Sequence, residues 1–274
     1  MTTTAHYIIT RFNLRDDAAR KSPALDPAWL NKRLDLFESF CFPTVRAQTR
    51  TDFSWLLLFD VETPESVRER IASLAARWDL IRPIFLEPGL KQGAKRAVQK
   101  AMTNAPDRLV TTRLDNDDGL ASNYVETIRK FSEQDEATVL EFPAGYIWNK
   151  GKVYRDWQPR NAFGTLVEPM MGNLDYPFQT IYKGSHSENY KLGKVLWVSR
   201  EPGWLQVVHG SNLENNRRGM RRPLSVLRRS FSLPDRLFEA QEAEMGLRLD
   251  IVRTAFSYGV RRAAGTVKRR LLGT

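Results

Sequence analysis

The feature that most constrains this chain is a β-strand that leads directly into a cluster of aspartates. Residues 107–112 (Asp-Arg-Leu-Val-Thr-Thr) read as a strand, and residues 113–119 follow with the sequence Arg-Leu-Asp-Asn-Asp-Asp-Gly. Carboxylates packed together raise one another's pKa unless a positive charge lies among them. The usual solution is a divalent cation held by oxygen ligands. Residues two apart on an extended chain point the same way, so we expect Asp115 and Asp117 to converge on one ion.

Strands and helices alternate through the first half of the sequence. We expect strands at residues 6–12, 53–60, 80–86 and 109–114, and helices at residues 27–40, 63–78 and 92–102, with Asp26 and Thr63 as caps and Pro64 in a first helical position. The apolar run at residues 53–60 is typical of a strand covered on both faces. The alternation predicts an α/β fold with a mixed, mostly parallel sheet flanked by helices.

The second half of the sequence has a different pattern of predicted elements. Short strand-like pieces separated by Gly, Asn and Pro occur at residues 145–148, 152–154, 178–182, 195–198 and 204–209. They predict a partly antiparallel region with long loops, which often determine specificity. Beyond residue 220 the chain is basic, and we expect helices at residues 234–244 and 248–272. The predicted organisation is one domain over residues 1–220, in two halves (1–120 and 121–220), followed by a basic helical C-terminal extension over residues 221–274.

The positive charge is concentrated near the end of the sequence. The chain has a formal net charge of +10, and residues 221–274 hold twelve basic and five acidic residues. This asymmetry indicates contact with an anionic surface. In residues 252–272, apolar residues recur every three to four positions among Arg and Lys, which suits a helix lying on anionic lipid. Nucleic-acid binding by the same charges, or a solvated packing helix, remains an alternative.

Several classes are disfavoured by what the sequence lacks. No apolar run approaches the roughly 20 residues of a membrane span. The single Cys41 excludes an internal disulfide and a zinc cluster and favours a reducing compartment. The first residues have no basic segment followed by an apolar stretch, so we expect a cytoplasmic protein. Walker, GxGxxG, GxSxG and HExxH motifs are absent from the sequence.

With the aspartate motif placed after its strand, the order of elements resembles a GT-A-type glycosyltransferase over roughly residues 6–212. More narrowly, the chain resembles the bacterial rhamnosyltransferase family. The segments that carry this likeness are residues 7–12, 53–55, 111–120, 161–163 and 204–210. The resemblance implies a nucleotide-diphospho-sugar transferase fold in which residues 1–120 bind the nucleotide and residues 121–220 bind the acceptor.

The resemblance also implies a metal site. Asp115, Asp117 and His209 are the candidate ligands for Mn²⁺ or Mg²⁺, and a nitrogen ligand favours Mn²⁺. The ion would neutralise the departing nucleoside diphosphate. A plain Asp-rich turn is one alternative. A calcium loop, with Glu126 as its last ligand, is another, although Leu120 stands where that loop needs glycine. His209 also has an ordinary alternative, a hydrogen-bonded histidine at a strand end.

Further candidates bind the nucleotide or act on the acceptor. The nucleotide candidates are Thr10, Arg11, Asp60, Arg113 and Asp115, which lie near strand ends. By position along the fold, the loop carrying His186 and Glu188 resembles the place where inverting enzymes hold their base. Asp156 and Glu168 are rival bases, and a solvated loop is the simplest alternative for residues 186–188.

Taken together, these features predict a metal-dependent glycosyltransferase, inverting by resemblance. It would move rhamnose or another hexose from a nucleotide diphosphate sugar to a saccharide or glycolipid in surface polysaccharide synthesis. We expect it in the cytoplasm, peripheral on the inner membrane face through its C-terminal helix, and do not expect a nucleic-acid partner. The rival hypotheses are a noncatalytic basic protein that binds nucleic acid or membrane, and a phosphohydrolase that uses the same aspartates.

Overall fold

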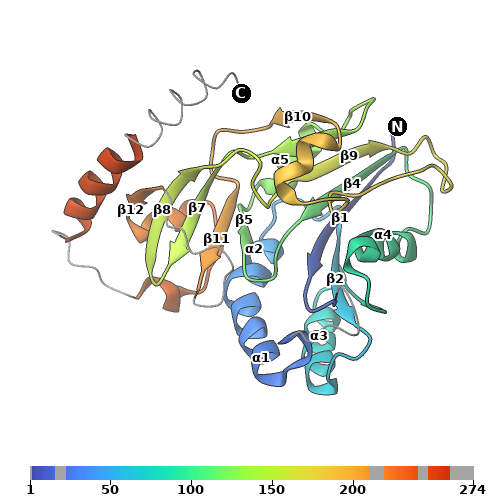
Figure 1. Cartoon of the computed structure of the whole chain (residues 1–274), viewed down its shortest axis with the longest axis horizontal. Coiled ribbons are helices and arrows are strands. Elements are labelled where there is room, and N and C mark those ends of the chain that lie inside the picture. The colour runs from blue at the N-terminus through green and yellow to red at the C-terminus, as the bar shows by residue number, and fades with distance from the viewer. Residues whose placement is uncertain (1, 16–22, 210–218, 240–245, 260–274) are drawn as a thin grey trace.

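Two β-sheets lie side by side, with helices packed against them (Figure 1). The structure, a computed structural model, describes residues 2–15, 23–209, 219–239 and 246–259. The larger sheet has the strand order β10-β6-β9-β4-β1-β2-β3, and the smaller has the order β12-β8-β7-β11-β5. This confirms the expected α/β class with mixed sheets flanked by helices.

The larger sheet places most of its strand ends at one edge. Its strands are β1 (Thr4–Arg11), β2 (Ser54–Asp60), β3 (Ile81–Leu86), β4 (Arg108–Arg113), β6 (Thr138–Glu141), β9 (Thr165–Pro169) and β10 (Lys194–Trp197). Only β9 is antiparallel to its neighbours, β4 and β6. The carboxyl ends of the other six strands therefore point the same way. Ligands of such sheets bind beyond these ends.

The core lies on both faces of this sheet, as the apolar run in β2 predicts. Leu57 and Phe59 belong to the cluster on one face, and Leu56 and Leu58 belong to the cluster on the other. All four are fully buried. Successive strand residues point to opposite faces, so a strand covered on both sides needs apolar residues at every position.

The helices follow the predicted positions closely. They are η1 (Pro23–Leu25), α1 (Pro27–Leu36), η2 (Phe37–Cys41), α2 (Phe42–Arg46), α3 (Glu65–Ala76), α4 (Leu90–Ala101) and α5 (Tyr124–Lys130). Asp26 caps α1 as expected, because its carboxylate accepts from the Trp29 amide at 2.7 Å. The prediction for α3 was wrong: its N-cap is Pro64, not Thr63. The Thr63 hydroxyl instead donates to the Asp60 carbonyl at 2.6 Å, in the turn that follows β2.

The smaller sheet begins immediately after the aspartate cluster. It contains β5 (Gly119–Leu120), β7 (Ala144–Asn149), β8 (Lys152–Trp157), β11 (Trp204–Val208) and β12 (Met220–Arg222). Strand β11 pairs with β5 on one side and with β7 on the other. The Trp204 ring stacks on Phe163 at 5.1 Å, and its indole nitrogen donates to the Phe142 carbonyl at 2.9 Å. Because β4 of the larger sheet ends just before the aspartates and β5 of the smaller sheet begins just after them, the aspartate cluster connects the two sheets along the chain.

The predicted strand at residues 178–182 is irregular in the structure. The Gln179 and Thr180 amides donate to the Glu168 carboxylate at 2.8 and 3.0 Å, and the Ile181 amide donates to the Thr111 hydroxyl. With these donors bound to side chains, the segment cannot pair as a strand. The strands at 138–141 and 165–169 were not anticipated from the sequence.

The C-terminal region is only partly described. Short 3₁₀ turns occur at η3 (His186–Lys191), η4 (Leu224–Arg229) and η5 (Asp235–Phe238). The helix predicted for residues 234–244 is present at its start as the short 3₁₀ helix η5, and residues 240–244 lie outside the described ranges. Residues 246–259 are helical as expected, and residues 260–272 of that predicted helix also fall outside. None of the described helices is long and apolar enough to cross a membrane.

We predict that Gly145→Ala destabilises the protein by about 1–3 kcal/mol, the usual cost of overpacking a core. A Cβ atom at this position in β7 would lie 2.0 Å from the Trp204 ring, which Phe163 and Phe142 hold in place. Urea unfolding measures the effect. Gly246→Ala is the matched control, because its added Cβ meets nothing within 4 Å, and we expect a change within about 0.5 kcal/mol. Equal values for the two variants would contradict this account of the sheet.

Candidate active site

The three aspartates that follow β4 have different surroundings. Residues 115–118 form a turn in which the Asp118 amide donates to the Asp115 carbonyl at 3.2 Å. The Asp118 side chain is 4% exposed and accepts from the Val207 amide of β11 at 2.8 Å. Burial, together with the charges of Asp117 and Asp115, raises the pKa of Asp118 well above its ordinary value. Asp118 therefore connects the turn to the smaller sheet and is closed to a ligand.

Asp117 lies at the centre of a compact polar group. Its Oδ2 accepts from Arg33 Nη1 at 2.8 Å and lies 2.8 Å from His209 Nε2. Arg33 Nη1 and His209 Nε2 are 3.5 Å apart. Burial disfavours the charged carboxylate, but the hydrogen bond with His209 and the charge of Arg33 hold the pKa of Asp117 below its ordinary value. The structure thus brings Asp117 and His209 together, from chain positions 92 residues apart.

Asp115 does not join this pair. Its carboxylate is 36% exposed and lies 3.5 Å from Arg113 Nη2. Within the part of the chain that the structure describes, no group of three or more His, Cys, Asp or Glu side chains could hold a metal ion. The predicted trio of Asp115, Asp117 and His209 is therefore present as a pair and a separate, more exposed carboxylate.

Two arginines from neighbouring strands share one aromatic ring. Arg11 ends β1 and Arg113 ends β4, and their guanidinium carbons lie 4.8 and 5.1 Å from the centroid of the Tyr182 ring. The Tyr182 hydroxyl donates to the Ile9 carbonyl at 3.0 Å, which fixes the ring over the strand ends. Cations stack favourably on such a ring face. The arrangement concentrates positive charge beside Asp115.

Thr10 has a role in the core. It is fully buried, and its hydroxyl accepts from the Trp55 indole nitrogen at 2.9 Å. This buried hydrogen bond connects β1 to β2 within the core, so the Thr10 side chain stabilises the sheet. Its place within β1 leaves Arg11, the next residue, as the group that reaches the strand end.

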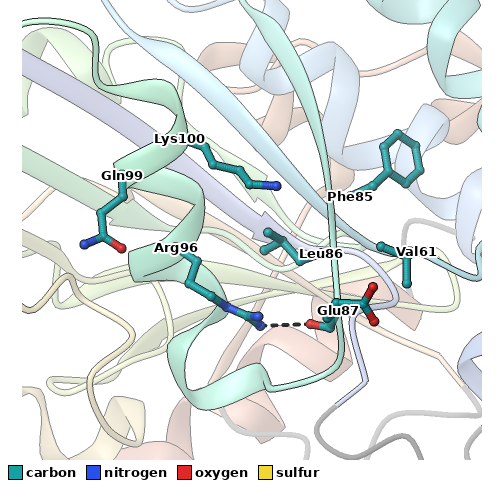
Figure 2. Close-up of a pocket in the computed structure, with 7 residues that line it drawn as sticks. All are labelled: Val61, Phe85, Leu86, Glu87, Arg96, Gln99 and Lys100. Carbon is teal, nitrogen blue, oxygen red and sulfur yellow. Dashed lines mark hydrogen bonds between the residues drawn. The ribbon is translucent and has the colours of Figure 1, made fainter.

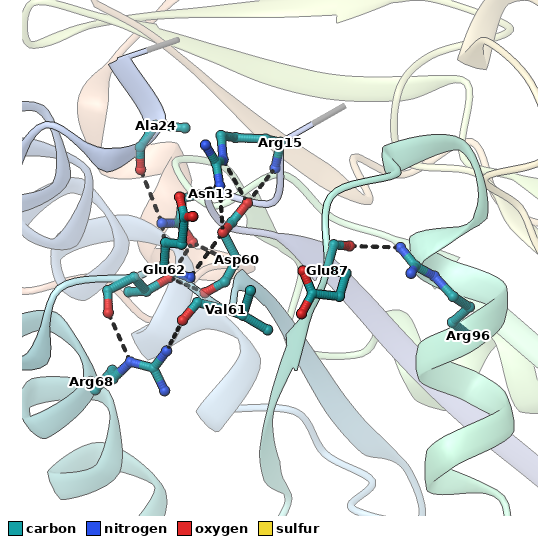
Figure 3. Close-up of polar contacts among 10 residues, drawn as sticks. Asn13, Arg15, Ala24, Asp60, Val61, Glu62, Arg68, Glu87 and Arg96 are labelled. Atoms are coloured by element: carbon teal, nitrogen blue, oxygen red, sulfur yellow. Dashed lines mark hydrogen bonds and ion pairs between the residues drawn. The ribbon is translucent and has the colours of Figure 1, made fainter. Parts of the chain in front are cut away.

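Asp60 forms the centre of a second polar network, at the end of β2 (Figure 3). Its carboxylate accepts from Arg15 Nε at 2.8 Å and Arg15 Nη2 at 3.1 Å, and from the Glu62 amide at 2.9 Å. Burial alone would raise the pKa of Asp60, but the Arg15 and Glu62 donors hold that pKa below its ordinary value. Asn13 bonds to the Asp60 amide and to Thr63, which ties the ends of β1 and β2 together.

A cavity of about 480 Å³ opens next to this network, between the end of β3 and α4 (Figure 2). The lining residues are Val61, Phe85, Leu86, Glu87, Arg96, Gln99 and Lys100. Arg96 donates to the Glu87 carbonyl at 2.9 Å across one side of it. The cavity combines apolar side chains with cationic groups, and its volume lies within the range of small-ligand pockets.

The candidate bases lie in η3, outside the Asp117 group. Glu188 is exposed and forms an ion pair with Lys191, and His186 is partly buried. The rival bases are both buried and bonded to backbone amides: Asp156 accepts from the Trp157 amide, and Glu168 accepts from Gln179 and Thr180. Of these four residues, Glu188 is the accessible carboxylate.

Three residues of these sites were missed from the sequence. Arg33 lies on a helix 84 positions before Asp117, Arg15 follows β1, and Tyr182 lies in an irregular loop. No local motif marks any of them. Arg33 carried one weak signal, since it is a basic residue on the partly buried side of a helix that precedes the aspartate strand.

Comparison with known proteins identifies a family and several similar structures. A family model described as "Putative rhamnosyl transferase" matches residues 9–221, more than three quarters of the chain. No curated protein matches the chain. Among solved structures, S. aureus TarS 1–349 in complex with UDP is 10% identical with a TM-score of 0.46, and the likeness covers 74% of this chain and 60% of that one. GalNAc-T7 with UDP, GalNAc and Mn²⁺ is 15% identical with a TM-score of 0.45, covering 79% of this chain and 45% of that one. This chain thus spans about 60% of the length of the TarS fragment.

We predict that Asp60→Asn lowers the free energy of unfolding by about 2–4 kcal/mol, because it leaves the Arg15 guanidinium without its buried carboxylate. Urea unfolding at neutral pH measures the change. Glu62→Gln is the matched control. It alters a carboxylate that contacts the same arginine but is 61% exposed, so the expected cost is below about 1 kcal/mol. A larger loss from the Glu62 variant than from the Asp60 variant would show that the network is arranged differently.

Proposed function

Because this chain belongs to the rhamnosyl transferase family, we propose that it transfers rhamnose or another hexose from a nucleotide diphosphate sugar to a saccharide or glycolipid hydroxyl. Surface polysaccharide synthesis is the process that such a product serves. We place the reaction in the cytoplasm, where the free, buried thiol of Cys41 stays reduced.

The observation that carries this proposal is the Asp117–His209–Arg33 group beside the carboxyl end of β4. It supplies a partly buried carboxylate, an imidazole and a guanidinium within hydrogen-bond distance of one another. Glycosyl transfer from a nucleotide sugar leaves a diphosphate, so a site for it must stabilise negative charge that grows as the bond breaks. The position of this group at the ligand-binding edge of the sheet supports that role.

The donor atoms of this group fit a divalent cation. Two ligands adjacent in an octahedral shell, each about 2.1 Å from the ion, lie about 3 Å apart, and Asp117 Oδ2 and His209 Nε2 are 2.8 Å apart. Mn²⁺ or Mg²⁺ held there would neutralise the leaving diphosphate. Arg33 occupies the same carboxylate oxygen. Arg33 would therefore compete with a cation for Asp117, and its guanidinium is a group of the kind that donates to phosphate oxygens.

We assign the nucleotide part of the donor to the carboxyl ends of β4, β1, β2 and β3. Arg11 and Arg113, stacked on Tyr182, supply charge for the phosphates or ribose. Asp60 and the cavity between β3 and α4 lie at the ends of the next strands and suit the base and ribose. Asp115, beside Arg113 and partly exposed, is positioned to accept from a ribose hydroxyl. Thr10 contributes indirectly, through the packing of Trp55.

For inverting transfer, Glu188 is the proposed base, with His186 as the other candidate in the same turn. Glu188 takes the proton of the acceptor hydroxyl while that oxygen bonds to the anomeric carbon. The bond from the anomeric carbon to the diphosphate breaks at the same time, and its electron pair leaves with the diphosphate. The Glu188 carboxylate is exposed and pairs with Lys191, so an acceptor hydroxyl can reach it from solvent.

The first test is calorimetric titration of the protein with UDP, GDP and dTDP, each with and without Mn²⁺. We expect one nucleotide to bind in a manganese-dependent manner and Asp117→Asn to abolish that dependence, because the variant loses the anionic ligand. Asp35→Asn, an exposed carboxylate on α1, is the matched control and should bind as the wild type does. Unchanged manganese-dependent binding in the Asp117 variant would refute the assignment.

Arg33→Ala tests the competition directly within the same experiment. Without the guanidinium, Mn²⁺ alone should bind up to about tenfold more tightly, since an ion pair worth about 1.4 kcal/mol no longer opposes it. The exposed neighbour Lys32→Ala should leave manganese binding unchanged. Weaker binding in the Arg33 variant would mean that Arg33 supports the ion rather than opposing it.

We predict that Glu188→Gln lowers kcat at least about 100-fold while leaving nucleotide affinity within about twofold, as expected for a lost general base. Glu136→Gln is the control, because Glu136 is also an exposed carboxylate paired with a lysine, Lys194. Release of the nucleotide in the presence of acceptor measures both. If His186→Ala loses kcat and Glu188→Gln does not, the histidine is the base.

A further inference from the structure

The helix at residues 246–259 contacts the smaller sheet through polar side chains spaced four residues apart. Asp250 forms an ion pair with Lys152 of β8 at 3.2 Å. The Thr254 hydroxyl accepts from the Arg221 amide of β12 at 2.8 Å, and the Tyr258 hydroxyl accepts from the Trp157 amide at 3.1 Å. Residues four apart lie on one face of a helix, so these three contacts define the face that packs against the protein.

The other side of this helix presents large apolar side chains to solvent. Leu249, Val252 and Phe256 are 67%, 69% and 77% exposed. Their spacing of three and four residues places them in a single stripe. A surface helix ordinarily buries its apolar stripe and exposes its polar face, and this helix has polar anchors on the inside and an apolar stripe on the outside. Scattered apolar residues need no explanation, but a contiguous stripe marks an interaction surface.

The sequence that follows Asp250 is strongly cationic. Residues 251–274 contain six basic residues and no acidic residue, and Arg253, next to Val252, is exposed. Apolar side chains flanked by arginine and lysine suit the boundary between the headgroups and acyl chains of an anionic bilayer. In Figure 1 the helix, coloured red, lies on the outer side of β12 and β8, on the opposite side of the molecule from α4. Contact there is remote from the cavity between β3 and α4.

We propose that the outward face of helix 246–259 docks on an anionic lipid membrane, with Leu249, Val252 and Phe256 entering the bilayer interface. Two other partners fit less well. A duplex of nucleic acid is bound through phosphates and polar base edges, which leaves an apolar stripe without a role. A second copy of the chain would need about 800 Å² on each partner, and three side chains offer far less.

The test is flotation of the full chain with vesicles of phosphatidylcholine alone, or of phosphatidylcholine with about 30% phosphatidylglycerol. We expect binding to the anionic vesicles, and a loss of about tenfold or more in the double variant Val252→Ser with Phe256→Ser. The matched control is Met171→Ser with Leu174→Ser, which removes two side chains that are 69% and 48% exposed elsewhere. This control should bind as the wild type does.

Other outcomes would overturn the proposal. These are equal flotation of the stripe variant and the wild type, no flotation of the folded wild type, or binding to a DNA duplex that the stripe variant retains. Concentration-dependent dimerisation lost in the stripe variant would assign the surface to a second copy instead. The assay contains neither nucleotide nor acceptor, so its result is independent of the proposed transferase activity. Nucleotide binding by the stripe variant should equal that of the wild type.

Discussion

The candidate site depends on one buried hydrogen bond, from the Val207 amide to the Asp118 carboxylate. It fastens the turn after β4 to β11, and so joins the larger sheet to the smaller one. His209 leaves β11 two residues later and meets Asp117, which precedes Asp118. A carboxylate buried beside two others is costly. Here the buried Asp118 carboxylate holds the turn against β11, and this contact sets the distance between Asp117 and His209.

The charges at the carboxyl edge of the larger sheet are balanced in pairs. Asp117 is matched by Arg33, Asp115 by Arg113, and Asp60 by Arg15. The Asp117–Arg33 and Asp60–Arg15 pairs join segments far apart in the chain, whereas Asp115 and Arg113 are two residues apart at the end of β4. In the proposed function, a cation would replace Arg33 as the partner of Asp117, and a diphosphate would replace Asp117 as the partner of Arg33. The folded chain therefore holds a polar edge whose members already have counter-charges before any ligand arrives.

The candidate active site and the proposed membrane-docking surface lie on different parts of the fold and depend on different interactions. The carboxyl edge uses fixed, paired charges that are shielded from solvent. The C-terminal helix uses exposed apolar side chains on a helix that is itself anchored by polar contacts with the smaller sheet. The proposed function would use both surfaces, because a nucleotide-sugar donor is dissolved and a glycolipid acceptor lies at a membrane.

The sequence by itself determined the α/β class, the positions of β1, β2, β3 and β4, and the placement of the aspartates at a strand end, because apolar periodicity and helix caps act over a few residues. It misjudged residues 178–182, where side chains of β4 and β9 take the backbone donors that a strand would use. The family resemblance had already suggested that Asp117 and His209 share a site. Only the tertiary structure decided that Arg33 joins them, that Asp118 is structural, and that Leu249, Val252 and Phe256 face outward. These relations join residues from separate elements, and their distances follow from how the sheets pack, which no local pattern records.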